Sequence, residues 1–404
     1  MLYFHTDKGA CTGCGACYAA CPVKCIEMVK DTEGFLYPQS SDACIHCGKC
    51  EKVCPIRVSQ PQPEQQTHKA YCVLTKNKKI WRDSASGGAF TELCRAFGDE
   101  STLVVGAAWE GFDVVHHGVI GVDNIAPLRK SKYVFSEAHG VLDQIKKVLL
   151  DGEKVIFCGT PCQVAGVRRF LGKDYDNLLL IDLICHGVGS PKVFKDCIKL
   201  MEKQLDFSID AYQFRAKRST YDVDYLAKVT DAETGKVLYI RDDPYIQLFL
   251  RQDCLRPCCG ENCRFRRECR QGDITIADFK HLTKVFPSLV GDKYNYSSVI
   301  SNNQKGECVV SAFSSRVKML SCALDDIKAH NPLFYRQTVF SNNRDHFFGA
   351  YEEDPIAAIE KQTTAVRISK RSLIKRAASI LPQPVRKAGI LMIGRMKAWL
   401  LKKA

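Results

Sequence analysis

Short apolar runs alternate with amphipathic stretches along most of the chain, from about Tyr71 to Glu360. Runs rich in Val, Ile and Leu are typical of buried strands, and apolar residues three or four positions apart are typical of helices. The predicted strands are Leu103–Ala108, Lys154–Phe157 and Leu178–Ile184. The predicted helices are Val141–Leu150, Gln163–Leu171 and Pro191–Leu205. Strands with intervening helices predict an α/β domain.

A second group of strand-like segments follows at closer spacing. These segments are Ala211–Phe214, Asp224–Val229, Val237–Arg241 and Ile274–Ala277. Because they sit closer together, we expect an added antiparallel part, which would give the α/β domain α+β elements.

The two ends of the chain depart from this pattern. Residues 1–58 carry nine cysteines in an internal repeat, and residues 59–69 are mostly polar with two prolines, which is typical of a semi-rigid linker. Residues 361–404 hold twelve Lys or Arg and no Asp or Glu. We therefore expect a small N-terminal domain at 1–58, a linker at 59–69, a larger α/β domain at 70–360 and a basic helical tail at 361–404.

The tail has apolar residues on one helical face of residues 371–381 and again beyond the break at Pro382–Pro384. A basic amphipathic helix with Trp399 at its boundary fits docking on an anionic bilayer. A helix packed on the body of the protein or on an acidic partner fits the same pattern. Peripheral contact with the inner face of a membrane through residues 371–403 is one of these two alternatives.

Composition narrows the class of protein. The chain has 404 residues, 46% of them hydrophobic and 25% charged, as in globular proteins. No apolar run reaches the roughly 18 residues of a membrane span, and the N-terminus lacks a signal-peptide core, so we expect a cytoplasmic protein. The net charge is +13, but without the tail 46 basic residues face 45 acidic ones. A nucleic-acid partner is therefore not expected.

The 22 cysteines are the strongest chemical signal. Without a secretion signal they predict metal ligation or redox chemistry rather than disulfides. The motif C-x2-C-x2-C-x3-C-P occurs twice, at Cys11–Pro22 and again 33 residues later at Cys44–Pro55. Three thiolates at this spacing hold one 4Fe–4S cubane, and the fourth cysteine reaches the other one. The predicted ligand sets are Cys11, Cys14, Cys17 and Cys54, and Cys44, Cys47, Cys50 and Cys21.

A structural zinc site is the alternative for these cysteines, but zinc favours C-x2-C pairs separated by a longer loop. Gly13 and Gly15 allow the backbone to bend close to the sulfurs. Cys25 falls outside the motif and is interpreted as a buried thiol. The region resembles a bacterial-type two-cluster ferredoxin, which implies an electron relay whose terminus lies elsewhere in the chain.

Four segments of the α/β region carry candidate chemistry. Arg82–Thr91 is a Ser/Gly-rich turn before a helix, which fits a phosphate site as well as an ordinary turn. Val155–Gln163 and Leu180–Gly187 are strands that each end in a cysteine turn. Carboxyl ends of strands form the ligand crevice of open α/β sheets, so these cysteines either share a metal or are buried thiols. Asp253–Cys269 holds five cysteines, and metal ligation is the better interpretation.

Together these segments resemble the family of the β subunit of coenzyme F420 hydrogenases and dehydrogenases. The resemblance spans about Tyr71 to Asn331 and rests, in chain order, on SASGGAFTEL, LRKSKYVFS, VIFCGTPCQVAGVRRFL, LLLIDLICHGVGSPKVF, CLRPCCGENCRF and DITIADF. It implies an FAD-binding α/β domain with a third 4Fe–4S cluster. The implied ligands are Cys162, Cys185, Cys259 and Cys263.

This sequence departs from the family at two points. Three residues separate Cys259 from Cys263 where the family commonly has two, which leaves Cys258 and Cys269 open as substitutes. Lys280 stands where members often have Trp, a change expected on the substrate face.

The resemblance also implies a flavin site. The residues concerned are Ser86, Gly87, Gly88, Lys132, Tyr133, Thr160 and Asp278. The Ser–Gly–Gly turn would face the pyrophosphate, and Lys132 would offset phosphate charge or lie near flavin N1, or be an ordinary surface lysine. Asp278 would orient the cofactor or only cap the strand end.

His186 and Lys132 are the catalytic candidates. A histidine titrates near neutral pH, so His186 could donate a proton during reduction of the flavin or the substrate. A simple hydrogen bond within its turn is the alternative role for His186. No Ser–His–Asp or paired-carboxylate constellation is present in the sequence, so hydrolysis and group transfer are disfavoured.

The sequence therefore predicts an iron–sulfur flavoprotein oxidoreductase that passes electrons between ferredoxin-type clusters and FAD and exchanges a hydride with an organic substrate. That substrate is the deazaflavin coenzyme F420 or another organic molecule such as a sugar or lipid-linked intermediate. The expected partner is a low-potential electron donor or acceptor, such as a ferredoxin. A non-enzymatic electron-transfer subunit of a larger complex is the alternative, and a cluster-based regulator is disfavoured because no helix-turn-helix is evident.

Overall fold

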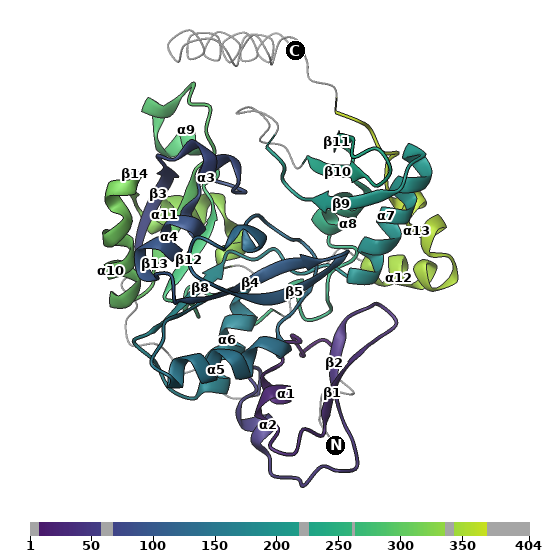
Figure 1. Ribbon diagram of the computed structural model, residues 1–404. Coiled ribbons are helices and arrows are strands. Elements are labelled where there is room, and N and C mark those ends of the chain that lie inside the picture. Colours follow the sequence, from purple (N-terminus) through teal and green to yellow (C-terminus); the bar gives the residue numbers. More distant parts are fainter. Residues whose placement is uncertain (1–7, 58–67, 218–225, 261–262, 336–342, 370–404) are drawn as a thin grey trace.

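The structure is a computed structural model that describes residues 8–57, 68–217, 226–260, 263–335 and 343–369 (Figure 1). The predicted linker lies almost wholly outside the described residues, and so do both predicted tail helices. No helix in the described part of the chain has the length and hydrophobicity that crossing a membrane requires.

The N-terminal domain is small and built around one hairpin. Strands β1 (Ile26–Lys30) and β2 (Leu36–Ser40) pair antiparallel. Helices α1 (Ala16–Ala20) and α2 (Lys49–Lys52) follow Gly15 and Gly48, which have left-handed φ values of 79° and 70°. Glycine adopts this conformation without a Cβ penalty, so the repeat places an equivalent turn before each helix.

One mixed sheet forms the centre of the larger domain. In the described residues its strands follow the order β14-β3-β13-β12-β8-β7-β4-β5-β6. Strands β4, β7, β8 and β12 run parallel to one another, and β13, β3, β14 and β5 are joined antiparallel. The bounds are β14 (Val317–Cys322), β3 (Lys69–Thr75), β13 (Ser297–Ser301), β12 (Ile274–Asp278), β8 (Leu178–Leu183), β7 (Val155–Cys158), β4 (Leu103–Glu110), β5 (Asp113–Ile120) and β6 (Ser136–Glu137).

Three of these strands confirm the predicted α/β domain, because β4, β7 and β8 cover the predicted segments, and the structure shows that they lie side by side and parallel. The placement of Ile274–Ala277 with the added antiparallel part was wrong. This segment is β12, which pairs parallel with β8 and antiparallel with β13. Helix α8 (Pro244–Arg251) and then the cysteine-rich segment Asp253–Cys269 separate it from the preceding strands, so the spacing along the sequence does not indicate its pairing with β8.

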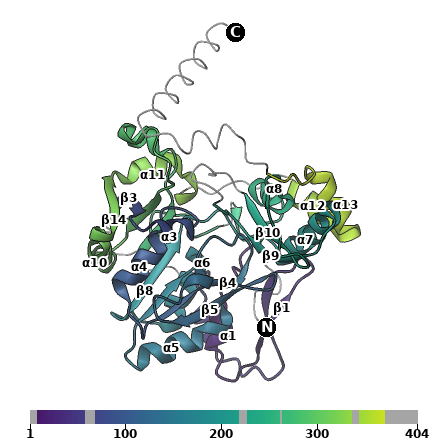
Figure 2. The same cartoon turned by 45° about the horizontal axis from the view of Figure 1, so that its top comes forward.

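Helices cover the sheet and continue beyond it (Figures 1 and 2). Those of the first half are α3 (Lys78–Arg82), α4 (Ala89–Phe97), α5 (Leu142–Leu150), α6 (Pro161–Leu171) and α7 (Pro191–Leu205). Those of the second half are α8 (Pro244–Arg251), α9 (Leu282–Val285), α10 (Gln304–Phe313), α11 (Leu324–His330), α12 (Asn343–Glu353) and α13 (Pro355–Gln362). Short 3-10 turns are η2 (Ala126–Leu128), η3 (His139–Val141), η5 (Pro287–Leu289), η6 (Ser314–Arg316) and η7 (Pro332–Phe334).

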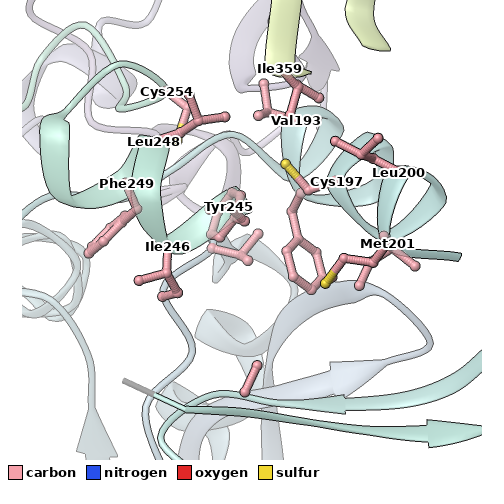
Figure 3. Packing of buried hydrophobic residues seen from close by; sticks show 14 of the residues in the cluster. Val193, Cys197, Leu200, Met201, Tyr245, Ile246, Leu248, Phe249, Cys254 and Ile359 are labelled. Atoms are coloured by element: carbon pink, nitrogen blue, oxygen red, sulfur yellow. The ribbon is translucent and has the colours of Figure 1, made fainter. Parts of the chain in front are cut away.

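The predicted antiparallel addition is confirmed for its other three strands. Strands β9 (Ile209–Gln213), β10 (Ala227–Asp231) and β11 (Val237–Ile240) form a separate antiparallel sheet. This sheet packs with α7, α8, α12 and α13 around a shared apolar core. Figure 3 shows that the sulfurs of Cys197 and Cys254 lie in this core, so these two cysteines pack as apolar side chains.

The helices and the hairpin turn of the N-terminal domain each contact the larger domain. Helix α1 packs against α6 and α5, at the lower edge of Figure 1. The turn of the β1–β2 hairpin reaches α7 and α12, where Ser190 Oγ donates to the Glu33 carbonyl at 2.5 Å and Arg344 pairs with the Glu33 carboxylate. These separate contacts fix the orientation of the small domain, so its cysteines hold defined positions relative to the sheet.

Candidate functional site

The first predicted ligand set lines one cavity of the N-terminal domain. Its walls include Cys11, Cys14, Cys17 and Cys54. Gly13 and Gly15 have φ values of 68° and 79°, and these left-handed turns let closely spaced cysteines face the same space. Cys54 comes from the end of the second repeat, as the crossed ligand pattern predicts.

Burial controls the charge of these thiols. It raises the pKa of Cys14 to about 12 and raises the pKa values of Cys17 and Cys54 as well. Metals bind the deprotonated thiolate. Thiols with raised pKa values therefore bind a metal only when its positive charge displaces their protons. Four converging thiols, three of them buried, fit a 4Fe–4S cluster.

The second predicted set lines a second, more exposed cavity. Cys21, Cys44, Cys47 and Cys50 form its walls together with Cys25. Cys47 is exposed, whereas Cys21 is buried. This donor set also fits a 4Fe–4S cluster.

Cys25 is buried, as the sequence predicted, and its sulfur lies 3.4 Å from that of Cys21. The backbone N–H of Cys25 donates to Cys21 Sγ at 3.4 Å. Such N–H···S bonds stabilise thiolate charge at a cluster ligand. The extra thiol therefore lies beside a predicted ligand.

The third predicted set comes together at the carboxyl ends of β7 and β8. Cys162 lies in the first turn of α6, just after β7, and Cys185 follows β8. Cys162 interacts electrostatically with Cys185, Cys259 and Cys263, and Cys185 with the latter two. Burial raises the pKa of Cys185 to about 12, whereas a hydrogen bond from Cys258 lowers the pKa of Cys259 to about 7. The four thiols fit the third 4Fe–4S cluster.

The two substitute ligands have different surroundings. Cys258 contacts Cys259 and lies near Arg256, on the side of the N-terminal domain. The charged neighbours of Cys269 are Arg267 and Arg270. Within the described ranges, no three His, Cys, Asp or Glu side chains gather closely enough to hold a single metal ion.

Helix α6 connects the first and third cysteine sets. A Cβ added at Gly166 would lie 2.8 Å from the Cβ of Cys14 and 2.9 Å from its sulfur. Cys162 and Gly166 are four residues apart, so they lie on one face of α6 about 5–6 Å from each other. Cys14 therefore packs directly against the helical turn that follows Cys162.

Predicted flavin residues meet at the carboxyl end of β12, the position of the ligand crevice in open α/β sheets. Arg215 forms an ion pair with Asp278, and its Nη1 donates to the Tyr133 hydroxyl at 3.4 Å. Lys217 Nζ donates to the Ser86 carbonyl at 2.6 Å. Ser86, Tyr133 and Asp278 come from distant parts of the chain, and the loop after β9 joins them.

Sequence reasoning missed Arg215 and Lys217. Burial lowers the pKa of Lys217 to about 7, and Arg215 has a left-handed φ of 51°, an unfavourable conformation for a non-glycine residue. The signal that could have found them is the pair of cations directly after the predicted strand Ala211–Phe214. Strained, buried cations at strand ends are typical of functional sites.

The glycines of the Ser86–Gly88 turn have a packing role in the sheet. A Cβ added at Gly87 would overlap the Val73 carbonyl oxygen, and the Gly87 N–H donates to Ser297 Oγ at 2.9 Å. Gly88 has a φ of 94°. The turn therefore needs glycine to approach β3 and β13, and the Gly87 N–H already has a partner within the protein.

A cationic recess lies next to the crevice. It is lined by Asp83, Trp109, Ala126, Pro127, Arg129, Lys130, Ser131, Lys132, Ala211, Tyr212, Gln213, Lys228 and Thr230. Burial lowers the pKa of Lys132 to about 7, and Arg129 Nε is buried without a hydrogen-bond partner in the described structure. Four cations face one carboxylate here, so the recess fits an anionic group such as a diphosphate.

The remaining two site residues have defined partners. His186 shares a hydrogen bond with the Phe249 carbonyl at 3.1 Å, and burial lowers the pKa of His186 to about 4. Thr160 caps α6 through a capping box with Gln163, and its hydroxyl lies 3.1 Å from Cys162 Sγ. His186 therefore orients its turn, and Thr160 orients a predicted cluster ligand.

Comparison with known proteins defines the class. Residues 10–73 match the 4Fe-4S dicluster domain, which supports iron–sulfur clusters in the N-terminal part. Residues 152–326 match the family described as the C terminus of the coenzyme F420 hydrogenase/dehydrogenase beta subunit. The protein is an iron–sulfur redox protein related to the beta subunits of these enzymes, which confirms the resemblance seen in the sequence.

A search of the solved structures finds a chain of the F420-reducing [NiFe] hydrogenase complex from Methanosarcina barkeri. The match has 16% identity and a TM-score of 0.43, and covers 73% of this chain and 94% of that chain. A search of the curated proteins finds no match.

Proposed function

We propose that the protein is a flavin-dependent oxidoreductase with three 4Fe–4S clusters, which transfers electrons between a low-potential protein partner and an organic substrate. Bound clusters exchange single electrons, and bound FAD converts single-electron transfer into hydride exchange. The observation that carries the proposal is the contact of Cys14 with Gly166, one turn of α6 from Cys162. It supports a continuous path from the N-terminal domain to the crevice.

The chain itself would bind and orient the cofactors. The three proposed thiol sets are Cys11, Cys14, Cys17 and Cys54; Cys21, Cys44, Cys47 and Cys50; and Cys162, Cys185, Cys259 and Cys263. For FAD, we propose the crevice around Tyr133, Arg215 and Asp278, with the cationic recess taking a phosphate-bearing part of the cofactor.

Lys132 is the proposed proton carrier. Its Nζ donates to the Pro127 and Arg129 carbonyls at 3.0 and 2.8 Å, and burial lowers the pKa of Lys132 to about 7. An amine with this pKa holds or releases a proton near neutral pH. His186 stays a positioning residue through the Phe249 carbonyl.

Anaerobic purification followed by iron, sulfide and flavin analysis tests this function. We expect about twelve irons and one FAD per chain. About eight irons without flavin would favour the alternative of a non-enzymatic electron-transfer subunit. A colourless preparation, or zinc in place of iron, would contradict both functions.

The substrate proposal has two forms, reduction or oxidation of the deazaflavin coenzyme F420, and conversion of another organic molecule such as a polysaccharide-pathway intermediate. Mixing the protein with reduced F420 under anaerobic conditions separates them. Bleaching of the bound flavin supports the first form, and an unchanged flavin spectrum supports the second.

The domain boundaries, cytoplasmic localisation and membrane contact are proposals of the same kind. Residues 1–58, 70–360 and 361–404 are the proposed ferredoxin domain, catalytic domain and tail. Flotation with anionic vesicles, comparing the full chain with a chain ending at Glu360, tests contact through residues 371–403. Equal recovery of the two chains would contradict the membrane role.

A further inference from the structure

Arg256 is a fully buried cation between the two domains. It comes from the segment just before Cys258 and Cys259, and its exposed fraction is 0%. Its Nε donates to the Cys11 carbonyl at 2.9 Å, and its Nη2 donates to the Leu36 carbonyl at 2.8 Å. The same Nη2 lies 3.8 Å from the sulfur of Cys11. One side chain of the larger domain thus reaches the first cysteine set of the N-terminal domain.

The surroundings of this guanidinium are aromatic. Its central carbon lies 4.2 Å from the ring centroid of Tyr37, 5.0 Å from that of Phe135 and 5.4 Å from that of Phe35. Its Nη1 is buried and has no hydrogen-bond partner in the described structure. Water is excluded, so charges near Arg256 interact through a low dielectric.

The counter-charge of Arg256 is unusual. The ionisable groups that favour the charged form of Arg256 are Tyr37 and three cysteines, Cys11, Cys258 and Cys259. None of these groups is a carboxylate. Burying a cation without an anionic partner is costly, and cation–π attraction to the three rings offsets this cost only in part. Thiolates that hold clusters would supply the missing negative charge.

We propose that Arg256 is a shared counter-ion for the cluster held through Cys11 and the cluster held through Cys259, and that it keeps the reduction potentials of both above that of the cluster at Cys47. The inference rests on the proposed three-cluster function. Each cluster gains one electron from the reductant, and its charge with four thiolates changes from about −2 to about −3. A fixed cation in dry surroundings stabilises the more negative state.

The position of Arg256 determines which clusters have the higher reduction potentials. Its guanidinium lies beside Cys11 and its carbonyl accepts a hydrogen bond from the Cys259 N–H at 2.9 Å, whereas the exposed set of Cys21, Cys44, Cys47 and Cys50 lines a different cavity. Higher potentials at the inner pair make transfer from the exposed cluster inward favourable. Electrons would therefore collect at the junction between the domains, next to α6.

Arg344 provides a matched control. It is also buried at this domain junction, at 8% exposure, where its Nε donates to the Leu255 carbonyl at 2.8 Å and its guanidinium pairs with Glu33. Neither of these partners is a predicted cluster ligand. Arg344→Met therefore removes a buried interdomain cation without removing one that contacts a cluster cysteine.

The experiment is an EPR-monitored redox titration with dithionite on anaerobically purified full-length protein, with iron analysis of each sample. We expect Arg256→Met to keep its iron and to weaken reduction of the two inner clusters about tenfold, a downward shift of 59 mV for one electron. The exposed cluster, identified as the component missing in Cys47→Ser, keeps its potential. Arg344→Met and Arg256→Lys keep wild-type potentials.

Unchanged potentials in Arg256→Met with about twelve irons per chain would overturn the inference and leave the proposed function intact. An equal shift in Arg344→Met would also overturn it. If Arg256→Met loses iron, Arg256→Lys tests whether the positive charge or the guanidinium itself is required. Clusters retained in Arg256→Lys and Arg344→Met support a required charge, whereas loss in Arg256→Lys shows that the guanidinium only holds the domains together.

Discussion

The two cavities of the N-terminal domain are lined by two copies of one repeat, but their surroundings differ. The cavity of Cys11, Cys14, Cys17 and Cys54 is built against the larger domain through α6. At the other cavity Cys47 is exposed, and the rim residues Ile45 and Val23 are 61% and 42% exposed. The same ligand motif can therefore serve an inner relay or a partner-facing site, depending on what packs against it.

Two equivalent glycines show the difference most clearly. Gly15 and Gly48 occupy the same position of the repeat and have similar φ values of 79° and 70°. A Cβ added at Gly15 would overlap the Cβ of His139, whereas one added at Gly48 would meet no atom within 4 Å. The turn requires glycine in both copies, and the domain contact requires it only in the first.

The largest expected effect is the order in which the clusters are lost in air. We expect the exposed cluster to degrade first, because oxygen and water reach its ligands, so that iron falls from about twelve to about eight per chain in a fast phase. Iron analysis and EPR over time measure this loss. Cys47→Ser is the control and should begin near eight irons without the fast phase, whereas a fast phase in that variant would contradict the comparison.

The next largest effect should be the difference in stability loss when each of the two equivalent glycines is substituted. Both Gly15→Ala and Gly48→Ala place a Cβ in a left-handed conformation, which costs about 1–2 kcal/mol. Gly15→Ala must also displace the backbone of η3, and overpacking adds about 1–3 kcal/mol. Anaerobic thermal unfolding of the iron-loaded protein should show the larger fall in Tm for Gly15→Ala. Equal falls would show that the inner contact contributes little.

The contact between Cys14 and α6 can be tested by itself. Gly166→Ala should destabilise the protein by about 1–3 kcal/mol and slow electron transfer to the third cluster, because the new methyl displaces Cys14. Gly349→Ala in α12 is the matched control, since a Cβ there meets nothing within 4 Å and alanine favours helix. Stopped-flow reduction by dithionite measures the rate. Identical rates in the two variants would argue against a path through α6.

The last prediction is a pH dependence of stability that arises from His116 in the larger domain. Burial lowers the pKa of His116 to about 4, and the ring nitrogens bond Ser136 Oγ at 2.7 Å and the Cys158 carbonyl at 3.2 Å. The unfolded chain takes up this proton below about pH 6.5 and the folded chain does not, so stability falls as the pH drops toward 4, by up to about 1.4 kcal/mol per unit.

His116→Gln should remove this histidine's contribution to the dependence of the unfolding free energy on pH. At pH 8 the substitution should change the unfolding free energy by less than the fall seen toward pH 4. Chemical denaturation at several pH values measures it. An unchanged slope in His116→Gln would assign the acid sensitivity to other buried groups, such as His186.

Most of the predictions came from the spacing of cysteines and apolar residues along the chain. The cysteine motifs predicted two sets of four thiols in a crossed pattern, because three thiols within one short loop can reach one cluster whatever the rest of the chain does. In the structure each set lines one cavity. The apolar runs likewise predicted β4, β7 and β8 as strands, and the structure places β7 beside β8, so that Cys162 and Cys185 lie near neighbouring strand ends.

Contacts between distant parts of the chain determined the features that local spacing could not predict. No local pattern places β12 beside β8, brings Arg215 to Asp278 or buries Arg256 against Cys11. Nor does one distinguish the inner cavity from the exposed one, since the two copies of the repeat have the same motif. Spacing along the chain predicts which thiols lie together, but their burial and the charges around them depend on neighbours that only the folded chain brings together.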